Sequence, residues 1–178
     1  VTPVQLSRAI GAIANDGILT TPHFLLDAPQ SPELELRWPT RRAITTETAG
    51  TVTRVLEAVV TEGTGAEAAI EGYRVAGKTG TAQKPLPGGR GYKGGGYVGS
   101  FIGYLPAEDP QVLICVTVDE PRNAIYGGVV AGPAFREIGS FAVSHLRIPP
   151  SSAPKDAADG SRATSPGVGP VSKGRDAD

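Results

Sequence analysis

The sequence predicts an α+β domain in which an antiparallel sheet carries helices on its faces. Three observations support this fold class. Apolar residues recur at helical spacing in two segments of the first 62 residues, three strand-like segments follow between residues 73 and 119, and another helical segment ends the apolar part of the chain. Strands that follow one another through short connections pair antiparallel, and helices on either side of them cover the sheet.

The first segment has the residues of a helix start. Thr2 can serve as the N-cap, Pro3 suits the first helical position and Gln5 completes a capping box. An apolar stripe at helical spacing follows, made of Leu6, Ala9, Ile10, Ile13 and Ala14. Gly17 is a natural stop, so we predict a helix that ends just before it.

The next stretch leads to a second helix. Ile18 to Leu26 is β-branched and Thr-rich, which predicts a strand or hairpin, and Pro29 to Thr40 contains three prolines and is predicted to be a loop. The second helix is expected from about Thr46 to Glu62, with Gly63 ending it. Its apolar stripe consists of Val52, Val55, Leu56, Val59 and Val60.

The hydrophobic period changes after Gly72, and three strands are predicted. They are Tyr73 to Gln83, Tyr97 to Leu105 and Gln111 to Asp119. A Gly/Pro-rich loop, Lys84 to Gly96, joins the first two strands, and the turn Pro106 to Pro110 joins the others as a hairpin.

The apolar strand and the helix that follow define the rest of the fold. Residues 112 to 118 are nearly all apolar, so we expect this strand to be central and covered on both faces. A helix is predicted from roughly Val130 to Leu146, with Pro133 either starting or kinking it.

Composition sets further limits. The formal net charge of −1 argues against a nucleic-acid partner, and no run reaches the roughly 18 apolar residues of a membrane helix. The single cysteine excludes an intramolecular disulfide or a Cys-rich zinc site. We expect no metal and no cofactor. The chain contains no Met and starts at Val1, so we expect a fragment or a processed product.

The C-terminal stretch differs from the rest of the chain. The last 28 residues, from Ser151, hold no aromatic residue and no Leu or Ile, and their four basic and four acidic residues cancel. Such a segment buries too little apolar surface to offset its ordering entropy. We therefore place the globular part at residues 1–149 and a disordered tail at 150–178.

One motif match is formal only. Gly72 to Thr79 fits the phosphate-binding pattern G-x-x-x-x-G-K-[ST]. A P-loop needs a strand before it and a helix after it, because the helix N-terminus helps to hold the phosphates. The residues after Thr79 include Gly80, Pro85 and Pro87, which cannot propagate a helix. A nucleotide site is therefore the weaker interpretation.

Lys78-Thr79-Gly80, which overlaps the end of this pattern, resembles the K-T-G element of penicillin-binding proteins and serine β-lactamases. In that comparison Lys78 supplies positive charge, and the hydroxyls of Thr79 and Thr81 bind the carboxylate of a D-alanyl-D-alanine terminus or of a β-lactam. Gly80 lets the substrate backbone lie close to the strand, and the Thr81 backbone N–H helps to form an oxyanion hole. Strict alternation would put Lys78 and Gly80 on one face and both threonines on the other, which a twisted edge strand can reconcile.

The resemblance extends over most of the chain and is closest to class B penicillin-binding proteins. The motifs that carry it, in order, are Val1 to Leu6, Ala12 to Gly17, Val75 to Gln83, Gly99 to Pro106, Val116 to Pro121, Tyr126 to Gly128 and Pro133 to Phe135. Ser100-Phe-Ile-Gly and Asp119-Glu-Pro121 look more like the division (septal) branch than the elongation branch. The resemblance covers about Val1 to Pro149.

The resemblance implies the C-terminal part of a D,D-transpeptidase domain that cross-links peptidoglycan through an acyl-serine intermediate. Its partners would be the D-Ala-D-Ala stem peptide, β-lactam antibiotics and other division or cell-wall proteins. The parent would be anchored in a bacterial cell membrane, with its catalytic domain on the extracytoplasmic face. In such proteins Lys84 to Gly96 would be a mobile loop beside the active site.

The catalytic residues of the family are expected upstream of this chain. The nucleophile lies in S-x-x-K, with a second motif S-x-N, and no S-x-N occurs here. The one S-x-x-K match, Ser152 to Lys155, lies in the predicted tail, and Pro154 forbids the helix that would present both side chains. We therefore expect this chain to provide the substrate-binding residues Lys78, Thr79, Gly80 and Thr81, to hold no catalytic residue and to be inactive alone.

Two other enzyme or binding classes stay open beside the transpeptidase. A serine β-lactamase or D,D-carboxypeptidase would share the fold, and a catalytically dead binding module would lack the nucleophile even in the parent. The remaining polar residues favour structural roles. Cys115 is expected to be a packed thiol, and His145 is expected to interact with a helix dipole. His23 has no evident metal partner, and Asp119 and Glu120 end a strand. A solvated loop is expected to carry Lys84, Arg90 and Lys93.

Overall fold

The computed structural model describes residues 1–24, 38–86, 88, 91–92 and 96–151. Helices and an antiparallel sheet combine in it, which confirms the predicted α+β class. The elements are α1 (Pro3–Ala14), β1 (Ile18–Leu19), β2 (Arg41–Arg42), α2 (Thr46–Thr61), the 3-10 helix η1 (Ala66–Ala68), β3 (Ala76–Gln83), β4 (Tyr97–Leu105), β5 (Val112–Asp119) and α3 (Gly127–His145).

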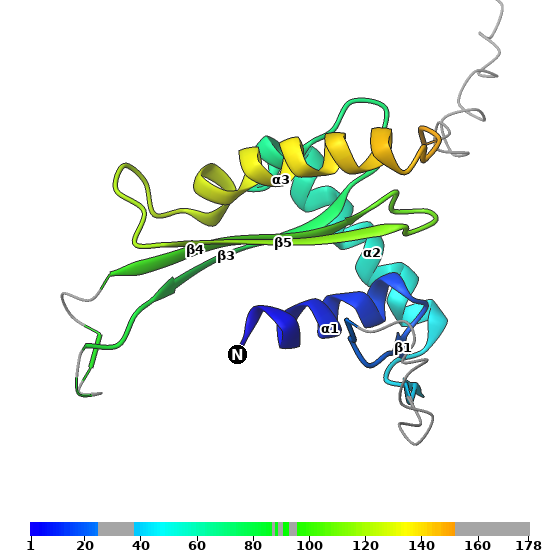
Figure 1. The fold of residues 1–178 in the computed structure, drawn as a ribbon, viewed down its shortest axis with the longest axis horizontal. Coiled ribbons are helices and arrows are strands. Elements are labelled where there is room, and N and C mark those ends of the chain that lie inside the picture. Colours follow the sequence, from blue (N-terminus) through cyan, green and yellow to red (C-terminus); the bar gives the residue numbers. More distant parts are fainter. Residues whose placement is uncertain (25–37, 87, 89–90, 93–95, 152–178) are drawn as a thin grey trace, which may run out of the picture.

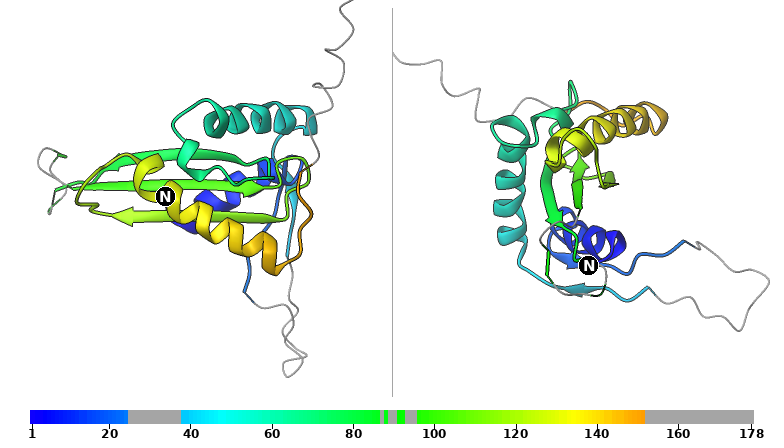
Figure 2. Two further views of the ribbon diagram at one scale, coloured as in Figure 1. Left: turned by 90° about the horizontal axis from the view of Figure 1, so that it is seen from above. Right: turned by 90° about the vertical axis from the view of Figure 1, so that its left-hand side faces the viewer.

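The sheet of β3, β4 and β5 lies between helices. Figure 1 shows α3 across one face of the sheet and α1 on the opposite face. Figure 2 shows α2 alongside the β3 side of the sheet, and α2 contacts β3 directly. Lys78 to Gln83 make up the last six of the eight residues of β3.

Alternation along β4 divides the core into two layers. Phe101 and Leu105 point towards α3, where Phe101 meets Phe135 edge to face with ring centroids 4.7 Å apart. Tyr104 points the other way and packs with Leu56 of α2. Successive strand residues face opposite sides, so β4 contributes to both layers and is the most buried strand.

The first two helices begin where the sequence predicts. The Thr2 hydroxyl accepts from the Gln5 backbone N–H at 3.2 Å, and the Gln5 side chain accepts from the Thr2 backbone N–H at 2.9 Å, which confirms the capping box. At α2, the Thr45 hydroxyl accepts from the Thr48 backbone N–H at 3.1 Å. Gly17 follows α1 with a φ of +85°, and a Cβ there would collide with the Ile44 carbonyl oxygen, so the position requires glycine.

Three predicted element boundaries are wrong. The strand expected from Tyr73 begins at Ala76, because Tyr73 instead forms an isolated bridge with Ile70. The strand expected over Ile18 to Leu26 is limited to the pair Ile18–Leu19, and residues 25–37, with most of the predicted loop, lie outside the described residues. The last helix begins at Gly127 rather than Val130, so Pro133 lies inside it and does not start it.

The predicted position of β5 also needs correction. The strand order is β3-β4-β5, so β4 is the central strand and β5 an edge strand among the described residues. Both faces of β5 are nevertheless in contact, since Ile114 packs on the α3 side and Leu113 on the opposite side. Coverage on two faces explains why residues 112 to 118 are nearly all apolar although the strand is not central.

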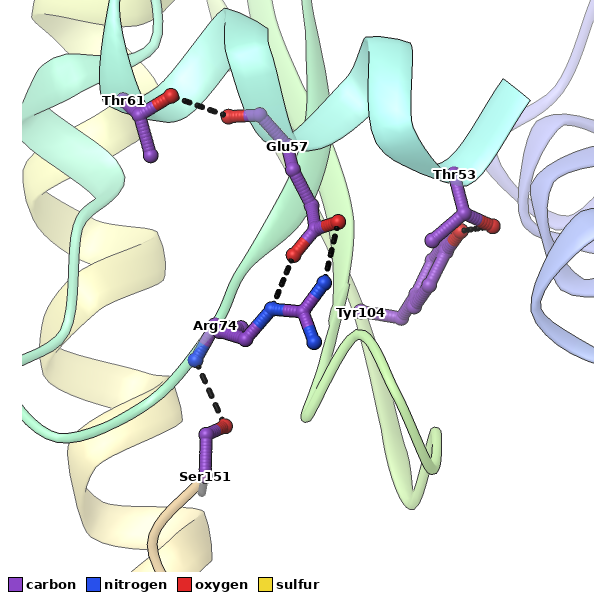
Figure 3. A network of polar contacts seen from close by, with 6 residues as sticks. All are labelled: Thr53, Glu57, Thr61, Arg74, Tyr104 and Ser151. Atoms are coloured by element: carbon purple, nitrogen blue, oxygen red, sulfur yellow. Dashed lines mark hydrogen bonds and ion pairs between the residues drawn. The ribbon is translucent and has the colours of Figure 1, made fainter. Parts of the chain in front are cut away.

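Polar contacts fix the segment that enters β3 (Figure 3). Arg74 donates from Nε and Nη2 to the two carboxylate oxygens of Glu57 in α2, at 2.7 and 2.8 Å. The Arg74 backbone N–H donates to Ser151 Oγ at 2.8 Å, and the Ser151 N–H donates to the Gly72 carbonyl at 2.9 Å. Ser151, which the sequence assigns to the tail, therefore bonds the segment that leads into β3. The tail beyond it lies outside the described residues.

Candidate functional site

The four predicted site residues lie on β3, and each is paired with a residue of β4. Gly80 pairs with Ser100 and Thr79 with Phe101 in the antiparallel register. Residues opposite each other in such a ladder point to the same face of the sheet. Phe101 packs towards α3, so Thr79 faces α3, whereas Gly80 and Ser100 face the α1 side.

Both threonine hydroxyls are hydrogen-bonded on the α3 side. Thr79 Oγ1 lies 2.9 Å from Thr64 Oγ1, in the loop between α2 and η1. Thr81 Oγ1 accepts from the backbone N–H of Gly127, the first residue of α3, at 3.1 Å. The Tyr126 N-cap makes no side-chain cap of its own, so Thr81 supplies the cap from a neighbouring strand. The two hydroxyls thus follow strict strand alternation.

Lys78 reaches the threonine side in spite of alternation. Its Nζ donates to the Thr79 carbonyl oxygen at 2.7 Å and lies 3.4 Å from Thr79 Oγ1. The long side chain bends around the edge of β3, and its position brings the ammonium group next to a hydroxyl. One strand edge therefore presents a positive charge and a hydroxyl together, which suits an anionic group such as a carboxylate.

Gly80 is small because of its neighbour on β4 as well. A Cβ at Gly80 would lie 2.5 Å from Ser100 Oγ. On this face a hollow of about 420 Å³ separates the strands from the first turn of α1. Its lining residues are Val1, Thr2, Pro3, Leu6, Gly80, Thr81, Ala82, Val98, Ser100 and Thr117.

Three elements meet at the site that sequence reasoning did not bring together. Thr64 bonds Thr79, Ser100 lies beside Gly80 and Gly127 bonds Thr81. None of the three was singled out individually as a site residue. Ser100 could have been found from a known β3–β4 register, whereas Thr64 and Gly127 lie on elements whose docking no local pattern shows. A Cβ on Gly127 would overlap the carbonyl oxygens of Gly80 and Ser100, so α3 starts in direct contact with the strands.

The end of β3 is tied to the end of β5. Lys84 Nζ lies 2.7 Å from Glu120 Oε1 and 3.0 Å from Asp119 Oδ1, so it is ion-paired rather than simply solvated. The hydrogen bond to Glu120, and then that to Asp119, raises the pKa of Lys84 above its ordinary value. Arg90 and Lys93 lie outside the described residues.

The other candidate residues have structural partners. Cys115 is half-buried on β5 and has no disulfide, His145 stacks on Phe141 in the last turn of α3, and His23 stacks on Trp38 with ring centroids 3.9 Å apart. Within the described part of the chain, no group of three His, Cys, Asp or Glu side chains could hold a metal ion. No helix among the described residues is long and apolar enough to cross a bilayer.

The P-loop interpretation does not fit the backbone. Gly77, Lys78 and Thr79 lie inside β3, and the next helix in the chain is α3, after two further strands. A phosphate cradle needs these residues in a loop that opens a helix. The K-T-G frame, by contrast, places them on a strand edge as expected.

Comparison with known proteins identifies the family. The penicillin-binding protein transpeptidase domain matches residues 1–140. The chain belongs to this family. It is 39% identical over 156 residues to stage V sporulation protein D of Bacillus subtilis. It is 43% identical over 152 residues to the probable peptidoglycan D,D-transpeptidase PenA of Neisseria flavescens. These matches confirm the class B resemblance.

Solved structures of this family share the fold. The crystal structure of penicillin-binding protein 3 from Mycobacterium tuberculosis in complex with ampicillin matches with a TM-score of 0.74 at 32% identity, over 87% of this chain and 37% of that one. The transpeptidase domain of Burkholderia pseudomallei penicillin-binding protein 3 matches with a TM-score of 0.72 at 37% identity, over 86% of this chain and 45% of that domain. The match spans 24% of the length of the Bacillus subtilis protein and 84% of this chain. For the Neisseria flavescens protein it spans 35% of that protein and 83% of this chain.

Proposed function

We propose that this chain is the substrate-binding, C-terminal portion of a peptidoglycan D,D-transpeptidase domain. The reaction cross-links stem peptides through an acyl-serine intermediate, and the same serine is acylated by β-lactams. The nucleophile and its lysine, in S-x-x-K, and the S-x-N motif would come from a part of the protein upstream of Val1. This segment would then contribute binding and orientation and be inactive by itself.

The observation that carries the proposal is the convergence of charge and hydroxyl groups on β3. Lys78 Nζ lies beside Thr79 Oγ1, and Thr81 Oγ1 is two residues further along the same face. The carboxylate of a D-Ala-D-Ala terminus or of a β-lactam accepts hydrogen bonds from such donors, and an ammonium group adds charge. The ampicillin complex of the Mycobacterium tuberculosis relative supports a β-lactam as the second ligand.

We further propose an extracytoplasmic, membrane-anchored parent that acts in cell division with other cell-wall proteins. The resemblance of Ser100-Phe-Ile-Gly and Asp119-Glu-Pro121 to the septal branch supports this role, as does the similarity to two proteins named penicillin-binding protein 3. The Thr81 backbone N–H is proposed as an oxyanion-hole donor.

The test is covalent labelling of the full-length protein that contains this segment with a fluorescent penicillin. The wild-type protein should be labelled at one serine, and the 178-residue chain alone should stay unlabelled because it carries no activated serine. Lys78→Ala should slow acylation roughly 100-fold, the effect of losing one strong electrostatic interaction with the reacting substrate. Arg54→Ala, which removes an exposed positive charge from α2, is the matched control and should label normally.

The other classes predict different results. A serine β-lactamase would release its penicilloyl adduct quickly, whereas a transpeptidase would keep it, so the rate of label loss separates them. A binding module without a nucleophile would leave the full-length protein unlabelled. Wild-type rates in Lys78→Ala would show that this lysine is not the K-T-G lysine.

A further inference from the structure

Thr64 lies beside the predicted carboxylate-binding residues but on a different element. Its Oγ1 is 2.9 Å from Thr79 Oγ1, and the two residues are 15 positions apart in sequence. Neither the K-T-G resemblance nor the family comparison assigns it a role. The hydrogen-bond donors around Thr79 indicate a role for Thr64.

A threonine hydroxyl has one proton and can accept two hydrogen bonds. Lys78 Nζ, 3.4 Å from Thr79 Oγ1, is an ammonium group that can only donate. A substrate carboxylate can only accept, so Thr79 can bind it only with its own proton. If Thr79 instead donated that proton to Thr64, the Thr79 hydroxyl would have no proton left to donate to the substrate.

We propose that Thr64 is a positioning residue that donates its hydroxyl proton to Thr79 Oγ1 and so directs the Thr79 proton to the substrate carboxylate. The Thr79 hydroxyl then accepts hydrogen bonds from Lys78 and Thr64 and donates one to the substrate. These three bonds use the full hydrogen-bonding capacity of the hydroxyl. The proposal rests on the transpeptidase function proposed above and names the donor direction within that site.

The backbone around Thr64 is held in place for this purpose. The N–H of Gly65 donates to the Val59 carbonyl oxygen at 2.9 Å, which ties the loop to the end of α2. A Cβ at Gly128 would overlap the Thr64 carbonyl oxygen and lie 3.2 Å from Thr79 Cγ2, so the first turn of α3 packs against both threonines. Contacts with α2, α3 and β3 therefore fix the distance between the two hydroxyls.

The test uses two substitutions in the full-length protein that contains this segment. Thr64→Val removes the hydroxyl and keeps the shape, and Thr64→Ser keeps the hydroxyl. The readout is the second-order acylation rate with benzylpenicillin, which has a free carboxylate, and with its methyl ester, which has none. Thr61→Val is the matched control, because the Thr61 hydroxyl donates within its own helix, to the Glu57 carbonyl oxygen.

We expect Thr64→Val to lower the rate with benzylpenicillin roughly tenfold, the size of one hydrogen bond, and to leave the rate with the ester within about twofold. Thr64→Ser should restore the difference between acid and ester, and Thr61→Val should not change it. Thr64 is exposed, so the valine variant should fold, and an unchanged thermal midpoint verifies this.

Three results would overturn the proposal. They are an unchanged rate with benzylpenicillin in Thr64→Val, an equal loss with acid and ester, and a serine variant that behaves like the valine variant. A wild-type protein that benzylpenicillin does not acylate would instead remove the transpeptidase function and this inference with it. The wild-type rate thus separates failure of the function from failure of the Thr64 role.

Discussion

Replacing Gly127 by alanine should destabilise the chain, although the residue lies in a helix. A Cβ there would overlap the carbonyl oxygens of Gly80 and Ser100 and lie 2.8 Å from the Ser100 nitrogen. These atoms belong to two paired strands, which cannot yield as a flexible side chain would. The first turn of α3 must therefore move outwards, and the hydrogen bond from the Gly127 N–H to Thr81 Oγ1 is lost.

The magnitude follows from two contributions. Forcing an extra carbon into a close-packed contact costs about 1–3 kcal/mol, and the lost hydrogen bond removes about 1 kcal/mol more. Alanine in place of glycine in a helix regains about 0.8 kcal/mol through helix propensity. The net loss in the free energy of unfolding for Gly127→Ala should then be about 1–3 kcal/mol.

Gly50 provides the matched control, because the same substitution should have the opposite sign there. Gly50 is exposed inside α2, and a Cβ at this position meets no atom within 4 Å. Gly50→Ala should therefore stabilise the chain by about 0.8 kcal/mol. Urea unfolding followed by circular dichroism measures both variants. A Gly127→Ala protein as stable as the wild type would refute the close contact between α3 and the strands.

Two further predictions concern the polar contacts of Figure 3. Burial raises the pKa of Tyr104 while its hydrogen bond with Thr53 lowers it, and the net shift is upwards. The folded state therefore holds the phenol proton more tightly than the unfolded state. The contribution of this proton to the free energy of unfolding is complete below pH about 10 and is lost as the pH rises further. Tyr104→Phe should lose about 1 kcal/mol at pH 7 but show a shallower decline between pH 10 and 11 in unfolding experiments, and an unchanged slope would contradict this. Glu57→Gln should cost about 1–2 kcal/mol at neutral pH because it weakens the paired hydrogen bonds with Arg74, and urea unfolding indistinguishable from wild type would show that the ion pair contributes nothing.

Local signals in the sequence located the elements whose ends are fixed locally. The Thr2 and Gln5 capping box needs only residues of the same turn, and α1 begins as predicted. The start of α3 could not be predicted in this way, because the group that caps it is Thr81, 46 positions earlier. Two consecutive glycines have poor helix propensity, so the sequence alone favoured a later start at Val130.

The candidate site was predicted only in the part that lies on one strand. Lys78 to Thr81 are contiguous, and a motif can show them. The strand order could not be predicted from composition, because β5 is apolar on both faces while lying at an edge. Without the strand register and the docking of α3, nothing in the sequence places Ser100 or Thr64 beside these residues.

The glycines at the site are explained by close packing rather than by backbone flexibility. Gly80 and Ser100 are paired, and a Cβ on Gly80 would meet Ser100 Oγ on the α1 side of the sheet. On the α3 side, Gly127 lies against the carbonyl oxygens of the same two residues. The strand pair is therefore close-packed, both between its own residues and against the first turn of α3, at the point where the carboxylate is proposed to bind. Because a Cβ on Gly80 would meet Ser100 Oγ and one on Gly127 would overlap the strand carbonyl oxygens, a change at either glycine shifts the position of Thr79 and Thr81, and stability and substrate binding should change together.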